Sequence, residues 1–377
     1  EKDDSIRKEK INARELFAKF MKERANTGRI YLQNVDHCNT HGAFNPSLAP
    51  IKQSNLCMEI TLPTKPLYSV QDENGEVALC TLSAVNLGAL DSLDELEDIT
   101  EIIVRSLDCL LDYQDYPLKS AELTSNNRRT LGIGVTNLAY YLAKNDAKYS
   151  DGSGNELIHK TFEALQFYSL KASNKLAIEF GACPLFSETQ YAQGILPIDS
   201  YKKDIDVFCN TKLELDWDSL RKDIKASGLR NSTLTALMPC ESSSQISNST
   251  NGIEPPRGFV SVKQSKDGIL KQVVPEYEKL HKKYELLWDI KDNEGYLQLC
   301  AIMQKFVDQS ISTNTHYDPS KFDGNRVPMK LFLMDLLKAY KYGIKTLYYH
   351  TTRDGASDDQ SINNPNDDDC EDGVCKL

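Results

Sequence analysis

The segment 54–59 reads Ser-Asn-Leu-Cys-Met-Glu and places three chemically useful side chains at alternate positions. In an extended chain the side-chain period is two residues, so Asn55, Cys57 and Glu59 would face one site. The amide can orient hydroxyl groups and the carboxylate can take a proton. The thiol can act as a nucleophile or, with one-electron input, can abstract a hydrogen atom. Taken alone this spacing is a weak pattern, and its ordinary interpretation is a surface loop with an inert buried cysteine.

Two further segments could bind or react with a substrate. Cys80 lies inside the apolar, strand-like run 76–82, where a buried free cysteine is common and needs no function. An apolar run at 232–238 leads into a turn rich in hydroxyl groups. Backbone N–H groups and hydroxyls after a strand can hold a phosphate, although an ordinary helix N-cap turn has the same composition. The residues of this turn are Pro239, Cys240, Glu241, Ser242 and Ser243.

Two pairs of identical residues lie near the end of the chain. Tyr348 and Tyr349 would point to opposite faces of a regular strand, so a stacked pair requires a local distortion. The ordinary arrangement is one tyrosine in the core and one at the surface. Cys370 and Cys375 suggest thiol–disulfide exchange, but an incidental pair or a weak metal site is also possible. The 16 residues between Arg353 and Cys370 would span roughly 20–25 Å as a flexible coil, so the pair could visit an internal site.

The composition limits the class of protein. The chain has 377 residues, of which 40% are hydrophobic and 26% charged, as in an ordinary globular protein. A net charge of −11 argues against binding to nucleic acids or to anionic membranes. Neither a membrane-spanning run nor an export signal is evident, so we expect a cytoplasmic protein with reduced thiols. The dispersed cysteines and six histidines argue against a structural zinc site.

The elements that must position these residues follow from hydrophobic periodicity. Strand-like segments alternate with amphipathic helices, which predicts a parallel α/β architecture. The long aperiodic segment 36–68 is expected to be a functional loop, because loops of this length are uncommon in compact domains. From about residue 354 the chain has too few apolar residues to order itself. The expected helices are 5–27, 92–113, 129–144, 155–180, 216–227, 275–289, 294–311 and 327–342, and the expected strands are 29–35, 76–82, 232–238 and 346–350, with a hairpin at 257–275.

Six stretches and the Cys-x4-Cys pair together resemble one family, the large subunit of class Ia ribonucleoside-diphosphate reductase. The matching stretches occur in the family's order over nearly the whole chain, and as a set they are very specific. The resemblance implies the C-terminal half of that subunit, with the second half of a ten-stranded α/β barrel. The implied divisions are a lead-in at 1–35, the finger loop at 36–68, the half-barrel at 69–353 and a disordered redox-active tail at 354–377. The stretches are Ser54–Thr64, Gly75–Ala84, Asn127–Gly134, Asn248–Arg257, Ser312–Thr315 and Lys345–Tyr349.

The resemblance also implies roles for the residues of the active site. Cys57 would become a thiyl radical and abstract the ribose 3′ hydrogen, a nearly reversible step because S–H and activated C–H bonds are similar in strength. Glu59 would accept the proton of the 3′-hydroxyl group, and Asn55 would hydrogen-bond the substrate. Cys80 would be one of two thiols that become a disulfide. Pro239–Ser243 would bind the substrate diphosphate, although Cys240 stands where a small hydroxyl residue is expected and a thiol is a weaker donor.

The remaining implied roles concern electron delivery and partners. Tyr348 and Tyr349 would relay a radical from a diiron-tyrosyl small (beta) subunit, so no cofactor is expected on this chain. Cys370 and Cys375 would reduce the active-site disulfide and would be reduced in turn by thioredoxin or glutaredoxin. The substrates would be ribonucleoside diphosphates.

The N-terminal half of the family's large subunit has no counterpart in this sequence. It would carry the allosteric nucleotide sites and the partner of Cys80, so we expect one half of a split reductase that is inactive alone. A fragment of a longer chain and a non-catalytic remnant that acts as an interaction partner are the alternatives.

Overall fold

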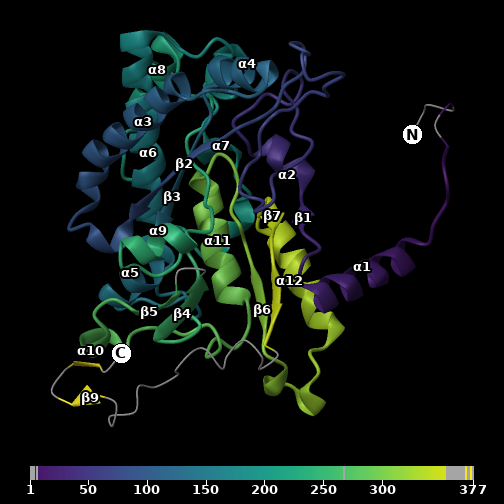
Figure 1. Cartoon of the computed structure of the whole chain (residues 1–377), viewed down its shortest axis with the longest axis vertical. Coiled ribbons are helices and arrows are strands. Elements are labelled where there is room, and N and C mark those ends of the chain that lie inside the picture. Colours follow the sequence, from purple (N-terminus) through teal and green to yellow (C-terminus); the bar gives the residue numbers. More distant parts are fainter. Residues whose placement is uncertain (1–4, 6, 266–267, 354–369, 372–373, 376–377) are drawn as a thin grey trace.

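The computed structural model describes residues 5, 7–265, 268–353, 370–371 and 374–375 (Figure 1). Side chains are not described for 263–269 or for the four residues near the C-terminus. The predicted disordered tail at 354–377 therefore lies almost wholly outside the described residues. At its end, β9 (Cys370–Glu371) pairs antiparallel with β10 (Val374–Cys375), with the backbone of Cys375 opposite that of Cys370.

The long helices of the described chain mostly follow the sequence predictions, whereas the helices at 35–40, 119–128 and 197–200 were not predicted. Errors in the bounds of predicted elements are given below. The α-helices are α1 (Ala13–Thr27), α2 (Val35–Thr40), α3 (Leu96–Tyr113), α4 (Lys119–Arg128), α5 (Leu138–Lys144), α6 (Asn155–Phe180), α7 (Pro197–Ser200), α8 (Trp217–Ser227), α9 (Glu241–Ile246), α10 (Tyr277–Leu280), α11 (Glu294–Phe306) and α12 (Met329–Lys341). The 3-10 helices are η1 (Leu87–Ala89), η2 (Leu93–Glu95), η3 (Phe186–Glu188), η4 (Tyr191–Gln193), η5 (Lys203–Val207), η6 (Pro319–Lys321) and η7 (Asp323–Asn325).

The strands are short, and several are joined by hydrogen bonds beyond their assigned ends. They are β1 (Leu32–Gln33), β2 (Thr81–Asn86), β3 (Leu131–Thr136), β4 (Val260–Ser265), β5 (Gly268–Val273), β6 (Thr315–Tyr317), β7 (Thr346–Leu347) and β8 (His350–Thr352). β4 and β5 form the hairpin that the sequence predicted at 257–275.

Five parallel segments lie side by side and form the framework of the molecule. β2 pairs with β3 in parallel from Thr81↔Leu131 to Asn86↔Thr136. The segment 233–238 continues the order through a parallel bridge between Ile133 and Thr235, and 309–313 follows through the bridge Leu237↔Ile311. β6, which continues from 309–313, then pairs in parallel with β8. The predicted parallel α/β architecture is thus confirmed, and β1 adds an antiparallel edge beside β7.

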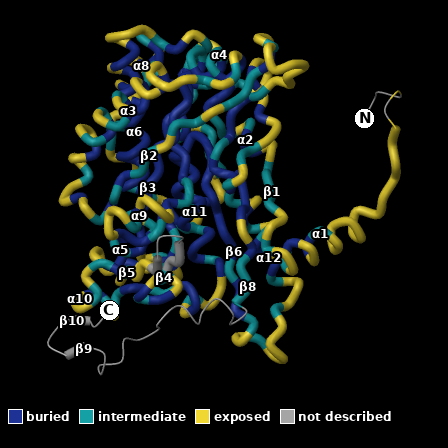
Figure 2. Tube along the Cα trace, in the orientation of Figure 1, coloured by how far each residue is buried: buried dark blue, intermediate teal, exposed yellow. Residues whose placement is uncertain are grey.

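Helices pack beside these segments and bury most of the central strands. Every residue of β3 is buried, and so is nearly every residue of α11, as the interior of Figure 2 shows. α6 is also buried along much of its length and lies beside α3 (Figure 1). Ion pairs such as Arg105–Glu179 and Lys171–Glu97 join the exposed sides of these two helices.

The predicted helix at 129–144 is wrong in its first half, which forms β3. Gly132 and Gly134 explain why this segment is a closely packed strand. A Cβ atom at Gly132 would lie 2.5 Å from Leu82 Cδ2 and 2.9 Å from Cys80 Sγ, and one at Gly134 would lie 2.7 Å from Met238 Sδ. Neighbouring side chains therefore occupy the space above both glycines, which a helical reading of the apolar pattern does not reveal.

Three other predicted helices are too long, one predicted strand is displaced and one is shortened. The helix predicted at 5–27 begins only at Ala13. The helix predicted at 275–289 is formed only at 277–280, and the one at 294–311 ends at Phe306, because 309–313 joins the sheet. The strand predicted at 76–82 lies at 81–86, and the one at 29–35 is limited to Leu32–Gln33. These are errors of position, which local periodicity determines poorly.

Candidate active site

The finger loop, residues 36–68, contains a tight turn at the candidate radical cysteine. Met58 N donates to Asn55 O over 3.2 Å, and Met58 has a φ of 69°. The expected extended geometry for residues 55–59 is therefore wrong, because a residue in the left-handed region interrupts the two-residue period. The Asn55 side chain stabilises the turn from inside, since its Oδ1 accepts from Ile60 N over 3.2 Å.

The segment 309–313 holds the two candidate reactive residues of the turn, Cys57 and Glu59. Ser310 N donates to Glu59 O over 2.9 Å. Ser312 Oγ donates to Cys57 O over 2.6 Å and lies 3.4 Å from Glu59 Oε2. Ser312 thus contacts both residues, although the sequence indicated it only as the first residue of a matching stretch. The turn and this segment bring Cys57 and Glu59 together at the same neighbour.

Burial changes the acid–base properties of both residues. Glu59 is 2% exposed, and burial raises the pKa of its carboxyl group, while hydrogen bonds from Asn55 and Ser312 oppose this shift. Burial also raises the pKa of the Cys57 thiol, against a hydrogen bond from Tyr348. The site therefore favours a neutral thiol and a carboxyl group that ionises at higher pH than an exposed glutamate.

Cys80 lies directly before β2 and contacts the segment 309–313 through Gln309. Gln309 Nε2 donates to Cys80 Sγ over 3.4 Å and to Leu131 O over 2.8 Å. Burial raises the pKa of the Cys80 thiol to about 12, and the Gln309 hydrogen bond partly opposes this. The structure thus places Cys80 near the finger loop, with Gln309 between them.

Three tyrosine rings form a group that reaches Cys57. The centroids of Tyr348 and Tyr349 are 4.0 Å apart, and Tyr31 lies 4.7 Å from the first ring and 5.4 Å from the second. The Tyr348 hydroxyl donates to Cys57 Sγ over 3.7 Å. Tyr348 is 5% exposed and Tyr349 is 38% exposed, so the group runs from the surface to the buried turn. Sequence reasoning missed Tyr31, which no motif indicated.

The close contact between the two tyrosine rings, which are tilted by 47°, is possible because the strand is interrupted at these two residues. β7 ends at Leu347 and β8 begins at His350. Tyr349 N donates to the side chain of Asn314 over 2.8 Å instead of to a backbone carbonyl. Arg24 of α1 donates to Tyr348 O over 2.9 Å. Tyr348 is buried and Tyr349 is exposed, as in the ordinary arrangement, yet their rings lie against each other, so the local distortion that a close pair requires is also present.

The candidate diphosphate loop, 239–243, comes at the end of the third parallel segment and leads into α9. The Cys240 thiol is buried and approaches the carbonyls of Val135 and Met238, which places it away from solvent. Cys240 N donates to Asn251 Oδ1 over 2.9 Å. One backbone N–H of the candidate loop is therefore already engaged within the protein. The thiol and the N–H of Cys240 both have internal partners, so any anion would be held by the residues that follow.

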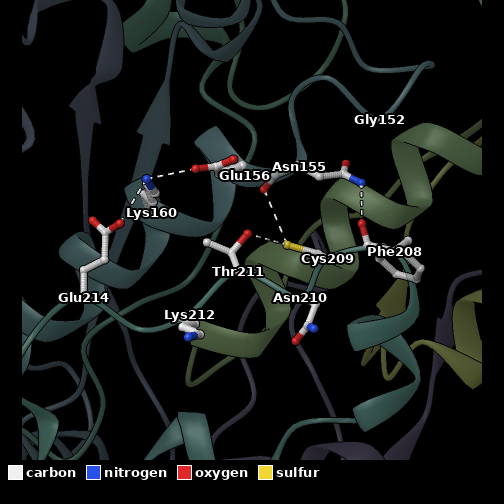
Figure 3. Close-up of a pocket in the computed structure, with 10 residues that line it drawn as sticks. All are labelled: Gly152, Asn155, Glu156, Lys160, Phe208, Cys209, Asn210, Thr211, Lys212 and Glu214. Carbon is white, nitrogen blue, oxygen red and sulfur yellow. Dashed lines mark hydrogen bonds and ion pairs between the residues drawn. The ribbon is translucent and has the colours of Figure 1, made fainter.

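The remaining candidates and a surface pocket complete the description. The side chains of Cys370 and Cys375 lie outside the described part of the chain, so their approach to Cys80 stays a prediction. A pocket of about 530 Å³ lies between the start of α6 and residues 208–214 (Figure 3). Its Lys160 pairs with Glu156 and Glu214, and among the described residues no candidate site residue lines it. No helix of the described chain is long and apolar enough to cross a membrane.

Five parallel segments, one of which holds a loop that bears a cysteine and a buried carboxyl group, define an α/β protein with a candidate active site at this loop. A family model described as "Ribonucleotide reductase, barrel domain" matches residues 1–350. The chain therefore belongs to the ribonucleotide reductase barrel-domain family.

Similar curated proteins specify the branch of this family. The ribonucleoside-diphosphate reductase subunit alpha of Haemophilus influenzae is 65% identical over 377 residues, covering 100% of this chain and 50% of that protein. The ribonucleoside-diphosphate reductase 1 subunit alpha of Escherichia coli is 66% identical over 379 residues with the same coverage. The subunit alpha of Enterobacteria phage T4 is 50% identical, again over 100% of this chain and 50% of its own length. The chain spans about half the length of these relatives and corresponds to a C-terminal half, as the resemblance implied.

Proposed function

We propose that this chain supplies the radical cysteine, the proton acceptor and one of two reducing thiols of a ribonucleoside-diphosphate reductase. The observation that carries the proposal is the continuous contact from Tyr349 through Tyr348 to Cys57 Sγ, beside the buried carboxyl group of Glu59. A cysteine with only a structural role would not require a neighbouring tyrosine pair in an interrupted strand. It would also not require a buried carboxyl group held by the same segment, 309–313. The names of the similar proteins support the same activity.

The chemistry follows from the placement of these groups. A thiyl radical at Cys57 would take the hydrogen atom from ribose C3′, and Glu59 would accept the proton of the 3′-hydroxyl group. The 2′-hydroxyl would then leave as water. Cys80 and a second thiol would together give up two hydrogen atoms and become a disulfide. The balance is one C–OH and two S–H groups converted into one C–H, one water molecule and one disulfide.

The partners follow from what this chain contains. The radical would enter at the exposed Tyr349 from a small subunit that carries a diiron-tyrosyl centre. The second thiol partner of Cys80, the allosteric nucleotide sites and the other half of the barrel would belong to an N-terminal half. In this proposal the substrate diphosphate contacts Ser242 and Ser243, because the thiol and backbone N–H of Cys240 are engaged internally.

Co-purification from the native source, followed by an activity assay, tests this proposal. We expect a second polypeptide with the first half-barrel to accompany the chain. Reduction of a ribonucleoside diphosphate should require both polypeptides, the small subunit and a thioredoxin or glutaredoxin. Turnover at normal speed by this chain with only the small subunit and a dithiol would contradict the split arrangement. A lack of reduction by the complete mixture would contradict the enzymatic function and favour the non-catalytic interaction partner.

A further inference from the structure

Gln309 is a buried residue that joins two parts of the site which are distant in sequence. It lies in the connection between α11 and β6 and is 0% exposed. Its Nε2 donates to Cys80 Sγ over 3.4 Å and to Leu131 O over 2.8 Å. Its Oε1 accepts from Thr61 N of the finger loop over 3.3 Å. One amide group thus contacts both the candidate reducing thiol and the loop that carries Glu59.

The orientation of this amide is determined by its neighbours. A flipped amide would place Oε1 against the carbonyl of Leu131 and Nε2 against the N–H of Thr61, which removes two hydrogen bonds. The backbone is also held, because Gln309 N donates to Thr235 O over 3.1 Å. Gln309 O accepts from the buried Lys345 Nζ and from Gln304 Nε2. The donor that faces Cys80 is therefore fixed by contacts at both ends of the residue.

We propose that Gln309 is a positioning residue that holds the Cys80 sulfur by an N–H···S hydrogen bond and ties it to the finger loop at Thr61. The amide stabilises the thiolate of Cys80 and sets its place relative to Glu59, two residues before Thr61. Its importance for turnover rests on the proposed function, but its effect on the thiol does not.

The electrostatic surroundings of Cys80 explain why one hydrogen bond matters. Burial, together with the negative charges of Glu59 and Asp308, raises the pKa of this thiol to about 12. Gln309 is the group that opposes these effects. A hydrogen bond to a charged group is worth about 1.5–3 kcal/mol, so its removal should decrease the thiolate population about tenfold or more.

Site-resolved alkylation tests this inference. The full chain, with any chain that co-purifies, would be treated with iodoacetamide at several alkaline pH values, and the Cys80 peptide would be quantified by mass spectrometry. We expect Gln309→Leu to slow alkylation of Cys80 about tenfold at a given pH. If Gln309 had only a structural role, its substitution would instead increase the alkylation rate, because a loosened site exposes the Cys80 thiol.

Gln304→Leu is the matched control. Gln304 is also a buried glutamine, and its Nε2 donates to Val307 O and Gln309 O without contacting Cys80. In this variant Gln309 O keeps its bond from Lys345 Nζ and Gln309 N keeps its bond to Thr235 O, so the backbone of Gln309 stays held. The alkylation rate of Cys80 should therefore remain within about twofold of the original value, since the thiolate keeps its donor.

A second variant covers the case in which Gln309→Leu does not fold. Gln309→Glu keeps the shape of the side chain but replaces the donor with a carboxyl group, so alkylation should again be slower. An unchanged or faster rate in the folded variants would overturn the proposal. Slower alkylation in a chain whose original form reduces no nucleotide would retain the positioning role and reject the proposed function. Normal turnover of the original chain, together with an unchanged alkylation rate in the Gln309 variants, would retain the proposed function and reject the positioning role.

Discussion

Cys57 is the residue on which the proposed chemistry depends, and its surroundings differ from those of an inert thiol. It accepts a hydrogen bond from a tyrosine hydroxyl and is only half-buried, whereas Cys183 and Cys300 are buried. We expect Cys57→Ala to abolish nucleotide reduction while changing the free energy of unfolding by less than about 1 kcal/mol, because little apolar area is lost. An activity assay with a denaturant titration measures both. Cys109→Ala, at an exposed thiol of α3, should retain activity.

Glu59 predicts the pH dependence of the reaction. A proton acceptor works in its ionised form, and burial raises the pKa of this carboxyl group. The acidic limb of the turnover profile should therefore lie at higher pH than for an exposed glutamate. Since the pKa is higher in the folded than in the unfolded chain, Glu59 stabilises the fold at low pH, and this contribution is lost as pH rises through the raised value. In Glu59→Gln the limb should disappear with most of the activity, and a profile unchanged in shape would contradict the assignment.

Tyr349 should control radical entry without affecting substrate binding. Tyr349→Phe keeps the ring contacts with Tyr348 and Tyr31 but removes the phenolic hydroxyl group that can be oxidised with loss of a proton. We expect turnover to fall below detection while nucleotide affinity changes by less than about twofold. Equilibrium binding and multiple-turnover assays separate the two effects. Tyr340→Phe, whose hydroxyl donates to Asp36 away from this group, serves as the control and should remain active.

Among the helices and strands, those whose structure is determined by a local sequence pattern could be predicted. Those whose structure is determined by contacts with distant residues could not. The long helices α3, α6 and α8 were predicted closely, because their apolar stripes and the glycine stop at Gly181 are local signals. β3 was missed because its glycines are required only by the close approach of Cys80, Leu82 and Met238, which the sequence does not show.

The site shows the same division between local and long-range determinants. The reactive residues could be named from motifs, but the turn at Met58, the role of Ser312 and the contact with Tyr31 depend on long-range packing. The interruption between β7 and β8 likewise depends on Asn314, which lies more than 30 residues earlier in the chain. Contacts of this kind leave no periodic signal in the sequence.

Gly132 gives a prediction for the packing of β3. In Gly132→Ala the new Cβ would lie within 3.0 Å of Cys80 Sγ and Leu82 Cδ2, which requires a shift of either side chain. We expect a loss of about 1–3 kcal/mol in the free energy of unfolding and a changed alkylation rate of Cys80. Gly134→Ala is the comparison, because its Cβ meets Met238 and Ala236 instead. It should destabilise the chain similarly but leave the reactivity of Cys80 unaltered, and equal effects of both variants on Cys80 would refute this explanation.

At the scale of the whole molecule, the five parallel segments have unequal edges. β1 covers the side of β7, whereas within the described residues β2 pairs only with β3. Leu82 of β2 and the preceding Leu79 are partly exposed at this edge. An uncovered strand edge with apolar side chains is a natural pairing surface, which agrees with the proposed N-terminal half as a partner.

The C-terminal thiols give a prediction for the complete catalytic cycle. If Cys370 and Cys375 regenerate Cys80, then Cys370→Ser and Cys375→Ser should each allow a single turnover and stop further ones with thioredoxin. A small dithiol able to reach the site directly should restore multiple turnovers. Rapid-quench and steady-state assays distinguish these cases. Normal cycling of both variants with thioredoxin would eliminate the shuttle role.

The change in burial along the tyrosine group has a consequence for isotope measurements. Tyr349 touches bulk water, so its phenolic proton can exchange with the medium at each oxidation. Tyr348 and Cys57 are hydrogen-bonded to each other inside the protein, so a proton passing between them stays local. In heavy water, the Tyr349 hydroxyl should therefore exchange its proton for deuterium faster than the Tyr348 hydroxyl and the Cys57 thiol do. A brief exposure would label the outer phenol before the inner pair, and this delay would report how often the interior opens.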